Sequence, residues 1–197
     1  MLSTIEKYYT EKINKHGPTP NGVDWNGQES QYLRFKILSD VIEEQNSSIL
    51  DYGCGYGAFY SYLKENNIKV NFTGFDISTD MLKQASKIHN DGVWISELDN
   101  TKYDYIIASG IFNVFLNNSK EEWEQHIINT INIFNNKSTK GFAFNMLTTY
   151  SDADKARDYL YYAEPEKMFQ FCKNNISKKV LLNHSYPLYE FTIVVKK

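Results

Sequence analysis

The middle of this chain alternates between short apolar segments and longer amphipathic ones. Segments rich in β-branched and aromatic residues predict strands, and segments with apolar residues three or four positions apart predict helices. The predicted strands are residues 47–52, 69–77, 92–96, 103–110 and 141–147, and the predicted helices are residues 56–67, 78–90 and 119–136. Strands separated by helices pair in parallel through crossover connections. We therefore expect an α/β fold with a doubly wound, mostly parallel sheet that helices cover on both faces.

The C-terminal end departs from this alternation. Pro165 is expected at the first position of a further helix. Residues 178–186 and 189–197 predict two strands with only Pro187 and Leu188 between them. A parallel return needs about a dozen residues or more. The two strands are therefore expected to form an antiparallel hairpin at the sheet edge, which brings the sheet to seven strands.

The N-terminal end predicts two helices joined by a loop. Ser3 and Glu6 match a capping box for a helix that ends near His16. Residues 17–27 contain glycines and prolines that resist regular structure, and they predict a loop placed to act as a lid. A second helix is expected at residues 28–45.

The length fits one domain, residues 1–197, with N-terminal helices and lid loop in residues 1–45 and the sheet core in residues 46–197. No apolar run reaches the roughly 18 residues of a membrane span, and the N-terminus has acids and tyrosines where a signal peptide is apolar. The sequence therefore predicts a cytoplasmic protein with no membrane partner. Cys54 and Cys172 lie far apart and the four histidines lack ligand spacing, so no metal site is expected.

The charge balance bears on the kind of partner. The 21 basic residues include only two arginines, Arg34 and Arg157, against 24 acids, for a net charge of −3. Nucleic-acid binders concentrate positive charge and use arginine for forked phosphate contacts. This composition argues against a nucleic-acid partner and favours a small molecule.

The sharpest motif is a glycine-rich turn after the first predicted strand. It reads Asp51-Tyr-Gly53-Cys54-Gly55-Tyr-Gly57 and leads into a helix. Such a turn lets a ligand approach the backbone closely at the carboxyl ends of the strands, so a nucleotide-type ligand is expected there. The turn also matches a relaxed dinucleotide fingerprint, which leaves a nicotinamide-dependent oxidoreductase as an alternative.

Two acids favour another cofactor. Asp51, two residues before the first glycine, would repel a pyrophosphate but attract a cation. S-adenosylmethionine carries an ammonium and a sulfonium group and no phosphate. Its two ribose hydroxyls suit Asp76, which ends the next predicted strand 25 residues after Asp51. The charges therefore favour S-adenosylmethionine.

Several motifs in order resemble the class I S-adenosylmethionine-dependent methyltransferases. The acid and three glycines of residues 51–57 resemble their first motif, residues 74–78 their second strand and its acid, and residues 103–110 their fourth strand. The spacing agrees from about residue 28 to 147, and the family's terminal antiparallel pair agrees with the predicted hairpin. The resemblance implies a Rossmann-like methyltransferase fold and methyl transfer.

The resemblance also implies cofactor contacts along the strand ends. Asp51 would hold the ammonium, Asp76 the ribose and Ile77 the adenine. The contacts implied in this way are Asp51, Gly53, Cys54, Gly55, Gly57, Asp76, Ile77, Glu97 and Ser109.

Other candidates come from residue chemistry. Arg34 could form a forked contact with the cofactor carboxylate or a surface salt bridge with a neighbour such as Glu29. Tyr9 and Trp25 could cover the sulfonium through cation–π attraction or belong to the core. Candidate acceptor contacts are Trp25, Tyr161 and Tyr162, and candidate catalytic residues are His16, His184 and Tyr161.

The expected function is transfer of a methyl group to an oxygen, nitrogen or carboxylate of a small molecule. The scarcity of arginine predicts an acceptor that is uncharged or singly charged and enters between residues 16–27 and 148–163. The alternative is a non-catalytic S-adenosylmethionine-binding module or sensor, because no catalytic base stands out. The sequence predicts neither the acceptor's identity nor the oligomeric state.

Overall fold

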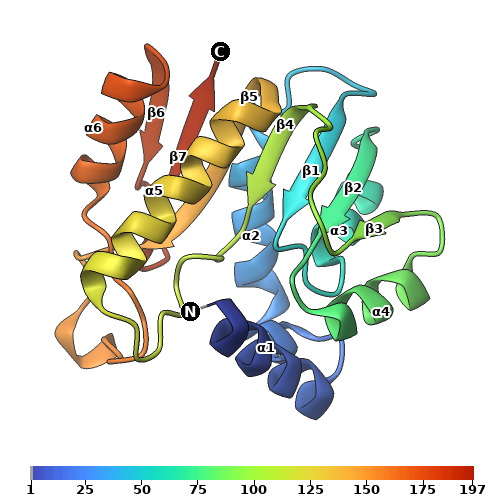
Figure 1. The fold of residues 1–197 in the computed structure, drawn as a ribbon, viewed down its shortest axis with the longest axis horizontal. Coiled ribbons are helices and arrows are strands. Elements are labelled where there is room, and N and C mark those ends of the chain that lie inside the picture. Colours follow the sequence, from blue (N-terminus) through green and yellow to red (C-terminus); the bar gives the residue numbers. More distant parts are fainter. Residues whose placement is uncertain (1) are drawn as a thin grey trace.

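A computed structural model describes residues 2–197, and its centre is a seven-stranded sheet in the order β3-β2-β1-β4-β5-β7-β6 (Figure 1). The first five strands pair in parallel, and β7 runs antiparallel to both of its neighbours. The predicted fold class and hairpin are therefore confirmed. The strands are β1 (Ser48–Tyr52), β2 (Asn71–Phe75), β3 (Val93–Ile95), β4 (Tyr103–Ala108), β5 (Ser138–Leu147), β6 (Lys179–Asn183) and β7 (Glu190–Lys196).

Helices cover both faces of the sheet and create two cores. Successive strand residues point to opposite faces. Leu50 and Ile106 join the core beneath α5 and α6, whereas Ile49 and Ile107 join the core beneath α2 and α3, and all four are fully buried. The helices are α1 (Leu2–His16), α2 (Gln28–Ser39), α3 (Ala58–Glu65), α4 (Thr79–Ile88), α5 (Lys120–Lys137) and α6 (Pro165–Asn175).

Capping residues fix where several helices begin. The Ser78 hydroxyl accepts a hydrogen bond from the Met81 N–H at the start of α4. Ser119 and Glu122 form a capping box at the start of α5. Pro165 is the first residue of α6, as predicted. The Ser78 and Ser119 side chains satisfy N–H groups that have no partner inside a helix, whereas Pro165 has no N–H to satisfy.

The N-terminal helices differ from the predicted boundaries. α1 already includes Leu2, so Ser3 lies inside the first turn and is not its cap. α2 ends at Ser39 and not near residue 45, because Val41 and Ile42 donate to carbonyls three residues back and the chain then turns. The predicted irregular loop also contains a short 3-10 helix, η1 (Pro20–Val23).

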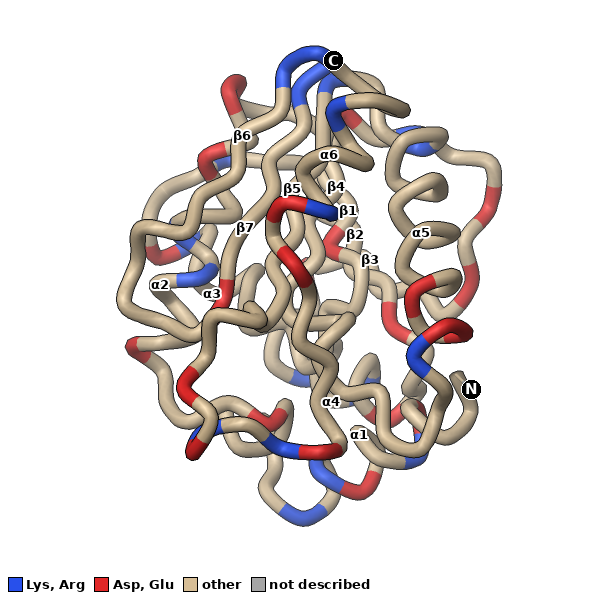
Figure 2. The backbone as a smooth tube through the Cα atoms, turned by 90° about the vertical axis from the view of Figure 1, so that its left-hand side faces the viewer, with Lys and Arg blue, Asp and Glu red and all other residues tan. Residues whose placement is uncertain are grey.

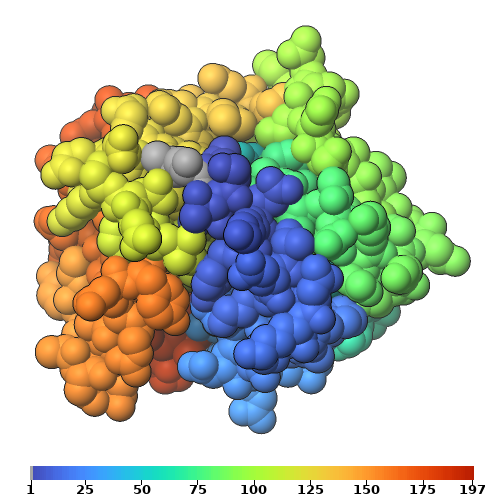
Figure 3. All heavy atoms as spheres, turned by 60° about the horizontal axis from the view of Figure 1, so that its bottom comes forward, coloured from blue at the N-terminus to red at the C-terminus, as the bar shows by residue number. Residues whose placement is uncertain are grey.

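Residues 2–27, which we call the cover, lie across the carboxyl ends of the central strands (Figures 1 and 3). Thr10 in α1 hydrogen-bonds Ser78 at the start of α4, with 2.8 Å between the hydroxyl oxygens. Within the cover, the Tyr8 hydroxyl and the Lys12 ammonium both donate to Asp24, at 2.7 and 2.6 Å. The Thr10–Ser78 hydrogen bond therefore links the cover to the start of α4, and the two bonds to Asp24 join α1 to the loop that follows it.

Candidate functional site

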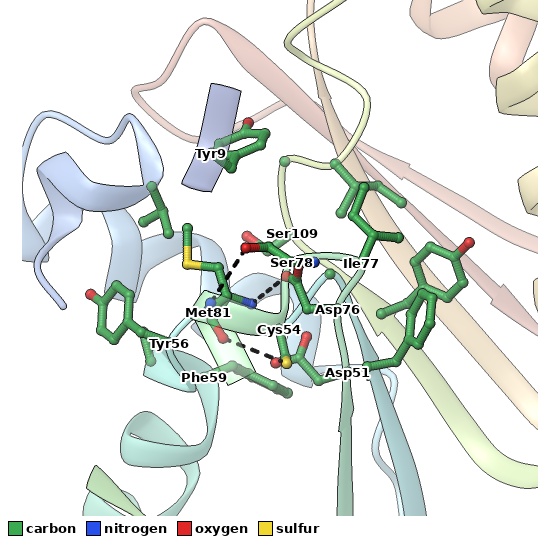
Figure 4. Close-up of a pocket in the computed structure, with 18 of the residues that line it drawn as sticks. Tyr9, Asp51, Cys54, Tyr56, Phe59, Asp76, Ile77, Ser78, Met81 and Ser109 are labelled. Atoms are coloured by element: carbon green, nitrogen blue, oxygen red, sulfur yellow. Dashed lines mark hydrogen bonds between the residues drawn. The ribbon is translucent and has the colours of Figure 1, made fainter. Parts of the chain in front are cut away.

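A pocket lies between the carboxyl ends of β1, β2 and β4 and the cover (Figure 4). Parallel strands end together at this edge, so residues far apart in sequence meet here. The sequence-predicted residues that line the pocket are Tyr9, Trp25, Asp51, Gly53, Cys54, Gly55, Asp76, Ile77 and Ser109. The structure thus brings together most of the predicted cofactor contacts, whose roles stay predictions.

The glycine-rich turn forms the floor of the pocket between β1 and α3. The φ angles of Gly53, Gly55 and Gly57 are 80°, 54° and 83°, values that residues with a side chain rarely adopt. A Cβ atom on Gly53 would lie only 2.4 Å from a methyl carbon of Ile111. Gly53 therefore keeps both the turn and the adjacent pocket wall open.

Asp76 joins the second strand to this turn. Its two carboxylate oxygens accept hydrogen bonds from the backbone N–H groups of Gly55 and Ser78, at 2.9 and 2.8 Å. Burial raises the pKa of Asp76 to about 6, although these two N–H groups oppose the shift. A carboxylate has about four acceptor sites, so each oxygen still has capacity for a ribose hydroxyl.

Asp51, unlike Asp76, has a buried carboxylate oxygen that accepts no hydrogen bond. Asp51 is 2% exposed, and its Oδ2 atom is the oxygen without a hydrogen-bond partner. Burial, reinforced by the nearby charge of Asp76, raises its pKa well above the usual value. A buried carboxylate oxygen without a partner is costly, and an ammonium group in the pocket would supply the missing donor.

These two carboxylates and the open turn fit S-adenosylmethionine. Asp51 offers an unpaired acceptor to the ammonium group, and Asp76 offers remaining acceptor capacity to the ribose. Ser109 adds a second buried oxygen without a partner at the end of β4. Tyr52, Phe75 and Ile77 supply apolar surface for a flat ring. The polar atoms and the apolar wall match the two halves of the cofactor.

Arg34 is not among the residues that line the pocket. Its side chain is buried and pairs with Glu190 at the start of β7, so it forms no surface bridge to Glu29. Its Nη1 atom has no hydrogen-bond partner, and its contact with the cofactor carboxylate stays a prediction. The Trp25 ring covers its guanidinium group. The partner comes from 156 residues further along the chain, which no local pattern indicates.

Six other candidates do not line the pocket. Glu97, His16 and His184 are exposed. The Tyr161 hydroxyl donates to Glu124, and the Tyr162 hydroxyl accepts from the Arg157 N–H. Gly57 is the N-cap residue of α3, and an added Cβ there would lie 2.7 Å from a Trp94 ring carbon. The structure therefore gives these residues surface or packing positions and places no pocket contact on them.

Several pocket residues were missed by the sequence reasoning. Gln31, Trp123 and His126 come from helices, whose inward faces cannot be assigned before packing is known. Tyr56 belongs to the glycine-rich turn, and Ser78 caps α4. Among the described histidines His126 alone lines the pocket, and burial lowers its pKa, which favours the neutral imidazole. His126 lies three residues after Trp123, and residues three apart share one face of a helix, so this spacing could have indicated that both point inward. The missed polar or aromatic lining residues include Gln31, Tyr56, Ser78, Trp123 and His126.

The described residues contain no group of side chains placed to hold a metal ion. None of the helices among residues 2–197 is long and apolar enough to cross a membrane. Cys54 and Cys172 are both buried free thiols.

Sequence comparison places the chain among known methyltransferases. A family model described as a methyltransferase domain matches residues 50–132. Rv1506c from Mycobacterium tuberculosis, assigned as a methyltransferase, is 46% identical over 155 residues, which cover 76% of this chain and 93% of that protein.

Solved structures share the fold. Magnesium protoporphyrin IX methyltransferase from Synechocystis PCC 6803, with bound S-adenosylhomocysteine, has a TM-score of 0.70 over 100% of both chains, at 11% identity. A methyltransferase from Archaeoglobus fulgidus that depends on S-adenosylmethionine has a TM-score of 0.63 over 87% of this chain and 95% of its own, at 14% identity. At these identities the likeness concerns the fold.

Proposed function

Because the chain belongs to the class I S-adenosylmethionine-dependent methyltransferases, we propose that it methylates an oxygen, nitrogen or carboxylate of a small molecule. Family membership establishes S-adenosylmethionine as the cofactor and methyl transfer as the reaction class. It replaces the nicotinamide alternative that the glycine-rich turn left open. The proposal concerns the acceptor and the residues that form the site.

The pocket's own residues are suited to hold the cofactor. We assign the ammonium group to Asp51 and the ribose to Asp76, on the basis of their acceptor capacity. When bound, S-adenosylmethionine supplies a methyl group already activated by a positively charged sulfur. The chain then has to orient the acceptor and exclude water, and a base is needed only for an acceptor that must lose a proton.

The observation that carries the small-molecule proposal is the closure of the pocket by the cover. Leu2, Ile5 and Tyr9 from α1 line one side, and Val23 and Trp25 from the following loop line another. An apolar enclosure with few polar atoms is typical of small-molecule sites. A folded protein or a nucleic-acid duplex would have to displace this cover.

Charge supports the same proposal. Among the described residues no lysine or arginine lines the pocket, whereas Asp51 and Asp76 both do. Basic residues lie near the C-terminus, at the opposite end of the sheet, and also on the surface around α1 and α4 (Figure 2). Lys178, Lys179 and Lys196 belong to that end. An acceptor that presents several phosphates to the pocket is therefore disfavoured, and an uncharged or singly charged acceptor is favoured.

Incubation with methyl-labelled S-adenosylmethionine tests the proposal. Purified protein is supplied with a metabolite fraction, a protein fraction and a nucleic-acid fraction in parallel, and the Gly53→Val variant serves as the control. We expect label in a small molecule that is absent from the control. Label confined to a macromolecular fraction would overturn the acceptor proposal, and cofactor binding without transfer to any fraction would support a non-catalytic binding module.

A further inference from the structure

Glu190, the first residue of β7, is fully buried and has a charged partner and an amide partner. Its Oε1 atom accepts from Arg34 Nε at 2.6 Å and also contacts the Nη2 end of the same guanidinium group. Its Oε2 atom accepts from the side-chain amide of Asn145 in β5. The carboxylate thus joins α2 to two neighbouring strands in the interior.

The Arg34 arm reaches the pocket through the cover. The guanidinium carbon lies 3.8 Å from the centre of the Trp25 ring, close enough for a cation–π contact. Trp25 itself lines the pocket. The ion pair with Glu190 therefore fixes the position of the Arg34 guanidinium group, against which the Trp25 ring packs.

The Asn145 arm reaches the pocket through the end of β4. Because the Asn145 nitrogen donates to Glu190, its amide oxygen is turned to accept from the Gly110 N–H, at 2.8 Å. Gly110 has a φ of 71°, and a Cβ on it would lie 2.3 Å from a Trp25 ring carbon. The two arms thus converge on one wall of the pocket, where Trp25 packs directly on the Gly110 backbone.

We propose that Glu190 is a positioning residue of the methyl-transfer site. Through Arg34 and Asn145 it holds Trp25 against Gly110 and keeps this wall of the pocket closed. A buried ion pair is expensive to desolvate, and apolar residues of the same volume often serve stability equally well. Apolar residues cannot form directional hydrogen bonds. The Glu190 carboxylate, in contrast, orients both the Arg34 guanidinium group beneath Trp25 and the Asn145 amide that accepts from the Gly110 N–H. The inference rests on the proposed use of this pocket as the cofactor site.

The test replaces both charges at once, because removal of one partner would leave a buried charge unpaired and prevent folding. Arg34→Met with Glu190→Gln keeps the side-chain volumes and the hydrogen bond with Asn145. The control makes the same kind of double replacement, Lys140→Met with Glu44→Gln, in another ion pair of the protein. That pair also joins the segment after α2 to β5, but its side chains are 37% and 63% exposed and neither residue lines the pocket.

Two readouts need no methyl acceptor. The chain has three tryptophans, so fluorotryptophan labelling gives three ¹⁹F signals, and Trp25→Phe identifies one of them. Stopped-flow measurement gives the release rate of S-adenosylhomocysteine. In the Arg34/Glu190 variant we expect the Trp25 signal to shift toward a solvent-exposed value and release to accelerate about tenfold. The control variant should change neither.

A mutant cycle separates positioning from a general loss of stability. Trp25→Ala alone should accelerate release to a similar extent, and adding it to the Arg34/Glu190 variant should give no further acceleration. Additive effects, or an unchanged release rate and Trp25 signal in the folded variant, would overturn the positioning role. Failure of the wild-type protein to bind S-adenosylhomocysteine in this pocket would instead contradict the proposed function.

Discussion

The pocket has two unlike sides, the strand-end edge and the cover. At the strand-end edge, Asp76 accepts from the backbone N–H groups of Gly55 and Ser78, which lie just after β1 and β2, and the sheet places these two strands side by side. The cover is held by side-chain bonds such as Thr10 to Ser78. The floor of the pocket therefore belongs to the sheet, whereas the cover is attached to it. Substitutions in the floor should therefore reduce the affinity for the cofactor more than substitutions in the cover.

The largest effect is expected for Gly53→Val. Valine at this φ costs on the order of 1–3 kcal/mol in strain, and its Cβ would meet Ile111 inside the pocket. We expect at least about a 100-fold loss of S-adenosylhomocysteine affinity by calorimetry, equal to about 2.7 kcal/mol. Gly17→Val is the matched control in the cover, because Gly17 has a φ of 67° with no atom within 4 Å of an added Cβ. Equal losses of affinity for the two variants would contradict the proposed difference between the floor and the cover.

Asp76→Ala should come next. It removes the acceptor for two backbone N–H groups and the proposed ribose contact. Hydrogen bonds to a charged group contribute about 1.5–3 kcal/mol, so the affinity for S-adenosylhomocysteine should fall about 10- to 100-fold. Asp91→Ala removes an exposed acid that pairs with Lys64 and should leave the affinity unchanged. Full-strength binding by Asp76→Ala would remove the ribose assignment.

The raised pKa of Asp76 predicts a pH dependence of the floor. Below its pKa of about 6 the carboxyl group is protonated and loses acceptor capacity. Through Asp76, the affinity for S-adenosylhomocysteine should therefore fall by up to about tenfold for each pH unit below 6. Asp51 shifts in the same direction and would steepen the fall.

The ligand-free protein should show the opposite sign. Because the Asp76 pKa is raised on folding from 3.8, the folded protein binds more protons than the unfolded chain between about pH 4 and 6. The contribution of this group to stability therefore decreases as pH rises through that window. Thermal unfolding of wild type and Asp76→Asn, each with and without S-adenosylhomocysteine, measures both effects. A pH-independent difference between the two proteins would exclude this linkage.

The cover should respond more weakly. Thr10→Val keeps the side-chain shape but removes the hydrogen bond with Ser78. One such bond contributes about 0.5–1.5 kcal/mol, so the denaturant midpoint should fall slightly, and S-adenosylhomocysteine affinity should fall about two- to threefold. A loss of affinity as large as that of Asp76→Ala would show that the cover contributes as much to cofactor binding as the floor does.

The smallest effect is expected for Glu97→Gln. The resemblance implied a cofactor contact for this acid, but the structure exposes it and places it outside the pocket lining. Its affinity for S-adenosylhomocysteine should stay within about twofold of wild type, as surface substitutions usually do. A tenfold loss by calorimetry would restore the original assignment.

The same contrast explains what the sequence could predict. Asp51, the glycines and Asp76 lie at strand ends, and strands are recognisable from short local patterns, so their meeting at one edge could be inferred before the structure was known. The lining by His126 depends on which face α5 presents to the sheet. The Arg34–Glu190 pair depends on β7 entering the sheet between β5 and β6. This pair joins residues 156 positions apart, and local periodicity carries no information about such a contact.

The central claim is that the strand-end edge binds the cofactor through the unpaired oxygen of Asp51 and the remaining acceptor capacity of Asp76. A crystal structure of the protein with S-adenosylhomocysteine tests it most directly. We predict that the ligand's amino group lies within hydrogen-bond distance of Asp51 Oδ2 and that its ribose hydroxyls contact Asp76. A ligand bound away from this edge, or one that leaves Asp51 Oδ2 without a partner and Asp76 without the ribose, would contradict the account.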